Sequence, residues 1–122
     1  MNNYLNFPRQ RRLTQKAEFK SVFDVSQKVS LKHLLALYKP NQKDGARIGI
    51  IVGKRVANLA ATRNQIKRVV RESFRAHQDQ LSGLDIIVIA RQHCDSLDKT
   101  QLREGIDTLW QRLLLQLKKS AR

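Results

Sequence analysis

The chain has 122 residues with 24 Lys and Arg against 10 Asp and Glu, so its formal net charge at pH 7 is +14, and nucleic acid is the first partner to consider. Its 41% of hydrophobic residues suffice for one packed domain over residues 1–122, which excludes a wholly disordered basic chain. No run of 18 apolar residues occurs, and the N-terminus carries charges where a signal peptide has its apolar run, so we expect a cytoplasmic protein without membrane association.

The N-terminal quarter predicts a basic extended segment followed by a short helix. Residues 1–13 contain three arginines and one proline. Thr14 can cap a helix that runs to about Asp24. Within it Phe19, Val22 and Phe23 fall at i, i+3 and i+4 and share one face.

Two strands are predicted next. Residues 34–38 and 47–52 are rich in aliphatic side chains, and the segment between them, P-N-Q-K-D-G, is rich in turn-forming residues. The pair is therefore predicted to form a hairpin with a long loop.

Residues 62–75, T-R-N-Q-I-K-R-V-V-R-E-S-F-R, predict an amphipathic helix with a cationic face. One stripe at helical spacing is suited to a core and comprises Ile66, Val69, Val70, Ser73 and Phe74. An adjoining arc comprises Arg63, Asn64, Lys67, Arg68, Arg71 and Arg75. Like charges at i, i+4 repel, so this ladder of cations indicates a polyanionic partner rather than a merely solvated face.

The C-terminal third predicts a buried strand and a long helix. Residues 85–90, D-I-I-V-I-A, are β-branched and almost wholly apolar, which suits a strand buried on both faces. Residues 99–118 are predicted to form a helix with an apolar stripe, in which Trp110 is a core residue. The order of elements predicts an α/β sandwich, with helices packed on a small mixed sheet and the basic helix as a βαβ crossover.

The motif R-N-Q-I-K-R-V-V-R-E-S-F-R, preceded by I-G-I-I-V-G-K-R-V and followed by L-D-I-I-V-I-A-R, resembles the bacterial ribonuclease P protein subunit. The resemblance extends to the N-terminal R-R-L and E-F-K-S-V-F and covers roughly residues 11 to 92. It implies a single-domain α/β sandwich whose βαβ crossover is left-handed, against the usual right-handed preference.

Three positions depart from the family pattern. The signature arginine, asparagine, arginine triplet reads Arg63, Asn64, Gln65, so its third charge is missing. The usual lysine pair reads Lys54-Arg55, and Gly53 stands where the family commonly has serine. These departures affect details of contact rather than the resemblance.

The family resemblance implies a cytosolic ribonucleoprotein that removes the 5′ leader of precursor tRNA. A catalytic RNA subunit and divalent ions, chiefly Mg²⁺ bound by that RNA, perform the chemistry, and no cofactor is integral to the protein. One protein and one RNA are expected per holoenzyme. The residues implied to bind the catalytic RNA are Arg63, Asn64, Lys67, Arg68 and Arg71, whose side chains suit phosphate oxygens. Asn64 could instead be a helix cap.

A cleft between the sheet and the N-terminal helix is implied to hold the leader. The residues that match its lining are Phe19, Phe23, Tyr38, Lys54 and Arg55. Aromatic faces stack on unpaired bases with little sequence preference. Phe19 and Phe23 could instead be core residues, a single inserted residue would replace Tyr38 by Leu37, and Lys54 and Arg55 could touch either RNA.

No protein-based catalytic site is predicted, because the acidic residues are scattered and no His lies beside a plausible nucleophile. Cys94 and the three His have no zinc-site spacing, and residues of any accessory metal site are not identified. Three other functions are weighed: a general or ribosomal RNA-binding protein, a DNA-binding helix-turn-helix module and a protein-only nuclease. A strand upstream of the basic helix argues against the second, and the missing carboxylate cluster argues against the third.

Overall fold

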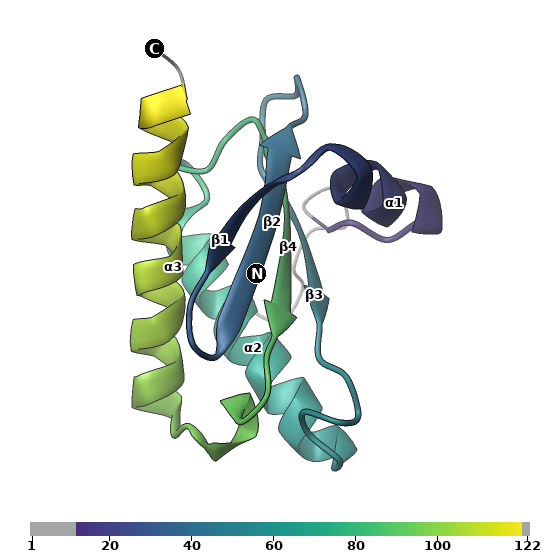
Figure 1. Cartoon of the computed structure of the whole chain (residues 1–122), viewed down its shortest axis with the longest axis vertical. Coiled ribbons are helices and arrows are strands. Elements are labelled where there is room, and N and C mark those ends of the chain that lie inside the picture. The colour runs from purple at the N-terminus through teal and green to yellow at the C-terminus, as the bar shows by residue number, and fades with distance from the viewer. Residues whose placement is uncertain (1–11, 121–122) are drawn as a thin grey trace, which may run out of the picture.

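The computed structural model describes residues 12–120, and most of the predicted basic N-terminal segment lies outside this range. Three helices and a four-stranded mixed sheet confirm the predicted α/β class (Figure 1). In chain order the elements are α1 (Lys16–Val25), β1 (Gln27–Ser30), β2 (Leu34–Pro40), β3 (Arg47–Ile51), α2 (Ala60–His77), β4 (Leu84–Ala90), a 3-10 turn η2 (Cys94–Ser96) and α3 (Lys99–Ser120).

The strand order β1-β2-β4-β3 contradicts the predicted hairpin. β2 and β3 do not pair, because β4 lies between them, antiparallel to β2 and parallel to β3. Six of the seven β4 residues are buried, and a strand that is apolar on both faces is most stable in the centre of a sheet. β1 was not predicted, because only Val29 of its four residues is buried and so short an edge strand carries little apolar signal.

The connection from β3 through α2 to β4 is a left-handed crossover. In Figure 1 both strands point down, β3 lies to the right of β4 and α2 lies behind the sheet. A path from β3 up through α2 and down β4 therefore turns left-handed, as the family resemblance implies and against the general preference for right-handed crossovers.

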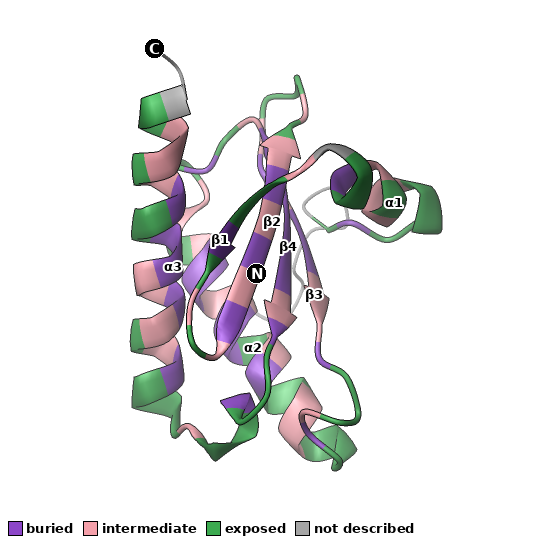
Figure 2. Cartoon of the chain, viewed as in Figure 1, coloured by how far each residue is buried: buried purple, intermediate pink, exposed green. Residues whose placement is uncertain are grey.

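The main core lies between the sheet and the helices α2 and α3 (Figure 2). The predicted stripe of α2 is buried throughout, and Trp110 of α3 is fully buried at an edge-to-face angle to Phe74 of α2. The indole Nε1 of Trp110 donates a hydrogen bond to Ser73 Oγ at 2.9 Å, and that hydroxyl donates to Asp107 Oδ1 at 2.6 Å. These bonds add a directional link to the apolar contact between α2 and α3.

The opposite face of the sheet, here called the α1 face, carries a much smaller cluster. Its buried members are Leu13, Val22 and Ile87, and α1 covers only part of it (Figure 1). The predicted cap Thr14 is not the N-cap of α1, which is Gln15. The backbone amides of Thr14 and Gln15 both donate to Glu18 Oε1 at 3.0 Å, so a carboxylate in the first turn does the capping.

Candidate RNA-binding surfaces

The cationic residues of α2 lie outside its buried stripe. Asn64 and Arg68 are exposed, and Arg63, Lys67 and Arg71 are half-buried. The N-cap of α2 is Leu59, so Asn64 lies inside the helix and the interpretation of Asn64 as a cap is wrong. The helix has no acidic residue in its first turn. This face of α2 can therefore offer guanidinium, ammonium and amide donors to an anion.

The cationic surface extends from α2 to the N-terminal segment. Arg12 forms a parallel bridge with Ile48 of β3, and the amide of Leu13 donates to the Ile48 carbonyl at 2.9 Å. Burial lowers the pKa of the Arg71 guanidinium, and the charge of nearby Arg12 lowers that pKa further. Two cations are thus brought together from segments far apart in the sequence, which favours an anion nearby.

The turn between β3 and α2 presents two more cations. Lys54 and Arg55 are both exposed. The amides of Val56 and Ala57 donate to the Gly53 carbonyl at 3.1 Å and close this turn. Because the turn leads directly into α2, Lys54 and Arg55 lie at the entrance of the basic helix.

On the α1 face, Phe19 and Phe23 differ in exposure. Phe23 is 48% exposed. Phe19 is half-buried, and its ring lies on the backbone of β3, where a Cβ built on Gly49 would be only 2.6 Å from Phe19 Cζ. Gly49 therefore makes room for Phe19, while Phe23 offers the more accessible aromatic surface.

The structure contradicts the placement of Tyr38 on the leader side. Tyr38 is 1% exposed and belongs to the main core, and its hydroxyl accepts a hydrogen bond from Gln116 Nε2 of α3 at 2.9 Å. Leu37, the alternative raised by the sequence, packs on the α1 face with Ile51 and Ile89. Strand alternation separates Tyr38 from Leu37, but both sets of alternating residues in β2 are largely apolar, so the pattern did not show which set faces the larger core.

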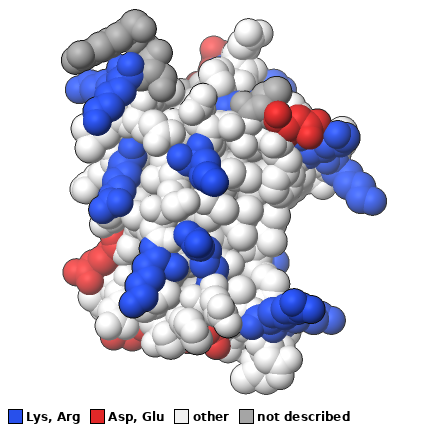
Figure 3. Space-filling model, viewed as in Figure 1, with Lys and Arg blue, Asp and Glu red and all other residues white. Residues whose placement is uncertain are grey.

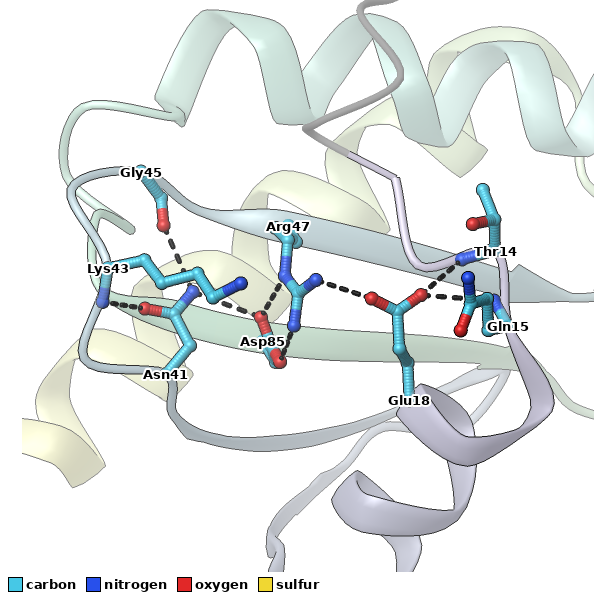
Figure 4. Close-up of polar contacts among 8 residues, drawn as sticks. All are labelled: Thr14, Gln15, Glu18, Asn41, Lys43, Gly45, Arg47 and Asp85. Atoms are coloured by element: carbon cyan, nitrogen blue, oxygen red, sulfur yellow. Dashed lines mark hydrogen bonds and ion pairs between the residues drawn. The ribbon is translucent and has the colours of Figure 1, made fainter.

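A polar network that the sequence did not predict joins α1 to the sheet (Figure 4). Arg47 of β3 donates through Nε and Nη2 to both oxygens of Asp85, at 2.8 and 2.6 Å, and through Nη1 to Glu18 Oε2 at 2.6 Å. Asn41 Nδ2 donates to Asp85 Oδ1 and to the Gly45 carbonyl, both at 3.0 Å. The buried carboxylate of Asp85 is thereby satisfied, and one guanidinium holds α1 against the sheet.

The network shifts the protonation equilibria of its members. The hydrogen bonds that Arg47 donates to the Asp85 carboxylate are the main cause that raises the pKa of Arg47. The backbone amides of Gln15 and Thr14 lower the pKa of the Glu18 carboxyl, and Arg47 lowers it further. Both groups are therefore held in their charged forms at neutral pH.

Comparison with known proteins identifies this arrangement. The family model described as Ribonuclease P matches residues 7–114. This chain belongs to the ribonuclease P protein family. It is 43% identical over 109 residues to the ribonuclease P protein component of Azotobacter vinelandii, which covers 88% of this chain and 84% of that relative. With the protein component of Pseudomonas aeruginosa it shares 43% identity over 110 residues, which are 89% of this chain and 82% of that relative.

Solved structures of ribonuclease P proteins share the fold. A Staphylococcus aureus RNase P protein, a mutant with defective mRNA degradation activity, superposes with a TM-score of 0.84 at 28% identity, over 93% of this chain and 98% of that one. The Thermotoga maritima RNase P protein in complex with 1-(4-fluorophenyl)-2-thiourea gives a TM-score of 0.71 at 30% identity, over 80% of this chain and 96% of that one. A ribonuclease P protein component is a subunit of an endoribonuclease whose RNA is catalytic.

Several ionisable side chains of this ribonuclease P protein have structural roles. Within residues 12–120 no three His, Cys, Asp or Glu side chains gather as a metal site would require. Asp85 and Glu18 are committed to Arg47, and burial raises the pKa of Cys94 to about 11, which keeps it a neutral thiol.

None of the helices within residues 12–120 is long and apolar enough to cross a membrane.

The side of the sheet that α2 and α3 leave uncovered also carries cationic side chains (Figure 3). Figure 3 shows Lys and Arg side chains spread over a largely uncharged surface, with Asp and Glu side chains mainly at its margins. Lys28 of β1 is exposed and pairs with Leu37 of β2, so it lies beside the half-buried apolar residues of the α1 face. Cations beside apolar surface are the combination that a single-stranded nucleic acid recognises.

Proposed function

We propose that this chain is the protein subunit of a ribonuclease P ribonucleoprotein that removes the 5′ leader of precursor tRNA. The observation that carries the proposal is that α2 has one apolar side and one cationic side. Its apolar stripe is wholly committed to the core, while five RNA-binding candidates of the family motif, Arg63, Asn64, Lys67, Arg68 and Arg71, retain exposed or half-exposed side chains. This face binds the phosphates of the catalytic RNA.

The α1 face binds the leader. Phe23 supplies an accessible aromatic ring, Phe19 a partly accessible one, and Leu37 takes the place predicted for Tyr38. Stacking and apolar contact do not distinguish the four bases strongly, which suits a protein that meets many leaders. Lys54 and Arg55 contact phosphate of either RNA from the entrance of α2.

The holoenzyme contains one protein and one catalytic RNA in the cytoplasm. Mg²⁺ is bound chiefly by the RNA, as the family resemblance implies. The protein contributes affinity and substrate positioning.

The first test is cleavage of a precursor tRNA by a catalytic RNA from a closely related bacterium at low Mg²⁺, with and without the protein. Stimulated cleavage at the mature 5′ end that declines as the leader is shortened would support both the subunit role and the leader surface. Salt-sensitive RNA binding without stimulation would support a general RNA-binding protein instead. Stimulation independent of leader length would contradict the α1 face as the leader site.

A second test addresses α2. The double substitution Lys67→Ala and Arg68→Ala removes two cations, so binding of the catalytic RNA should weaken and its salt dependence should fall by roughly 0.7–0.9 per lost phosphate contact. Lys118→Ala with Lys119→Ala is the matched control, because it removes the same charge from exposed residues at the end of α3. Equal losses in both variants would show that only net charge matters.

A further inference from the structure

Arg63 is hydrogen-bonded to the protein itself. Its Nη1 donates to the carbonyl oxygens of Ala57 at 2.9 Å and Asn58 at 2.8 Å. Both acceptors precede the helix that contains Arg63. One side chain from the first turn of α2 therefore reaches back and holds the segment that enters the helix.

That segment otherwise has few restraints at its junction with α2. The side chain of the N-cap Leu59 makes no capping hydrogen bond to α2, and the first turn of α2 contains no acidic residue. A cation near a helix N-terminus is disfavoured by the helix dipole, and the two carbonyl acceptors offset that cost for Arg63. Upstream, Ala57 is 1% exposed while Lys54 and Arg55 are exposed, so the turn is anchored at one end and presents its cations at the other.

We propose that Arg63 is a positioning residue that fastens the turn of residues 53–58 to α2, so that Lys54, Arg55 and the cationic face of α2 form one pre-organised surface for RNA phosphates. The inference rests on the proposed function for its RNA partner and revises one part of it: within the phosphate-binding face of α2, Arg63 acts through its neighbours rather than through a phosphate contact of its own. A turn already held in its bound geometry loses less conformational entropy when RNA binds.

Two consequences distinguish this role from a direct phosphate contact. Loss of Arg63 loosens the turn in the free protein, before any RNA is present. It also removes part of the contribution of Lys54 and Arg55, because cations on a loosened turn bind phosphate less well. The effects of substituting Arg63 and of substituting the turn cations are therefore less than multiplicative.

The first measurement is amide hydrogen exchange of the free protein carrying Arg63→Gln. The amides of Val56 and Ala57, which close the turn on Gly53, should exchange roughly tenfold faster, since a hydrogen bond from a charged donor changes an opening equilibrium by about that factor. The exchange rates are compared with that of the Leu113 amide in α3. Leu113 is fully buried, so its amide reports global unfolding. Arg68→Gln is the matched control and should leave the turn unchanged, because it removes the same charge from an exposed site on α2.

The second measurement is affinity for the catalytic RNA in a mutant cycle that combines Arg63→Gln with Lys54→Ala and Arg55→Ala. The combined variant should bind several-fold more tightly than the product of the separate effects predicts, whereas the same cycle with Arg68→Gln should be multiplicative. Unchanged exchange in Arg63→Gln, or a multiplicative Arg63 cycle, overturns the inference. Failure of the proposed function gives a different pattern, in which no variant alters RNA affinity while the exchange result still stands.

Discussion

The two faces of the β sheet are built by different forces. One face is covered by α2 and α3, and its core contains 23 buried residues, among them Trp110 and Phe74. The apolar cluster on the α1 face has three buried residues, with Phe19, Leu37, Ile51 and Ile89 only partly covered. The first face is therefore held by extensive apolar burial, while α1 is held by a few apolar contacts, chiefly that of the buried Val22, together with the ion pair between Arg47 and Glu18.

This difference separates stability from binding. Burial of large apolar side chains supplies most of the folding free energy, so the face with α2 and α3 can support a helix whose outer side is strongly cationic. The α1 face leaves apolar surface accessible beside cations, which is costly for folding but useful for an unpaired RNA strand. Substitutions on the two faces should consequently have different signatures.

The largest effect is expected where a buried charge joins α1 to the sheet. Asp85→Ala removes both acceptors from Nε and Nη2 of Arg47, whose side chain is only 16% exposed, and should lower the free energy of unfolding by about 3–5 kcal/mol. Urea denaturation measures this loss. Asp79→Ala, at an exposed position after α2, is the control, and a loss below about 1 kcal/mol for Asp85→Ala would show that the ion pair is not a main support of α1.

A leucine on each face compares apolar burial directly. Leu109→Ala in α3 should cost about 2–5 kcal/mol in unfolding free energy, because Leu109 is fully buried in the main core. Leu37→Ala should cost about 1 kcal/mol, since its site on the α1 face is only partly covered. The order of the two variants should be reversed for binding. When only folded protein is compared, Leu37→Ala should weaken the affinity for precursor tRNA more than Leu109→Ala does. Equal costs in stability would contradict the contrast between the faces.

Glu18→Gln should have a smaller effect that depends on pH. The folded state lowers the pKa of Glu18, so its charged contacts stabilise the protein above the ordinary pKa of the carboxyl and this contribution is lost as pH falls through the lowered value. At pH 7 the variant should lose about 1 kcal/mol of unfolding free energy, and the difference should vanish in acid. Glu104→Gln, exposed on α3, is the control. A difference that persists unchanged in acid would exclude the carboxylate charge as its cause.

Phe23→Ala should have the smallest effect on stability and a specific effect on binding. Phe23 is 48% exposed, so its loss should change unfolding free energy by only about 0.5 kcal/mol. Affinity for precursor tRNA should fall at least about fivefold, the low end for one stacked base, while affinity for mature tRNA should not change. Leu115→Ala removes a 60% exposed side chain from α3 and should alter neither. Equal weakening of both tRNAs by Phe23→Ala would argue against a leader contact.

Local patterns in the sequence predicted the elements that bury a periodic apolar surface. The helix around residues 62–75 and the helix from Lys99 were predicted because their apolar residues recur at helical spacing, and β4 because it is a continuous apolar run. The same helical spacing predicted the cationic face of α2, and the family resemblance implied the left-handed crossover. The assignment of phosphate and leader contacts to individual residues stays a prediction.

Other features depend on contacts between distant parts of the chain. β4 separates β2 from β3, which no local pattern reveals because strand pairing is set by the whole sheet. The burial of Tyr38 follows from the position of α3, which supplies Gln116. The bonds from Arg63 to Ala57 and Asn58 need the geometry of the turn, and those from Arg47 to Glu18 and Asp85 join residues 29 and 38 positions apart.

The amino-acid sequence by itself determined the strong positive charge, the amphipathic α2, the apolar central strand and the family, because these are properties of composition, periodicity and motif. Only the tertiary structure decided which residues of β2 face the main core, which cations are accessible and which of them hold segments of the protein in place. The physical reason is that hydrogen bonds and burial depend on distances between segments that are remote in the chain. An arginine in a basic motif has the same charge in either role, and only its neighbours in space determine whether it meets a phosphate or a backbone carbonyl.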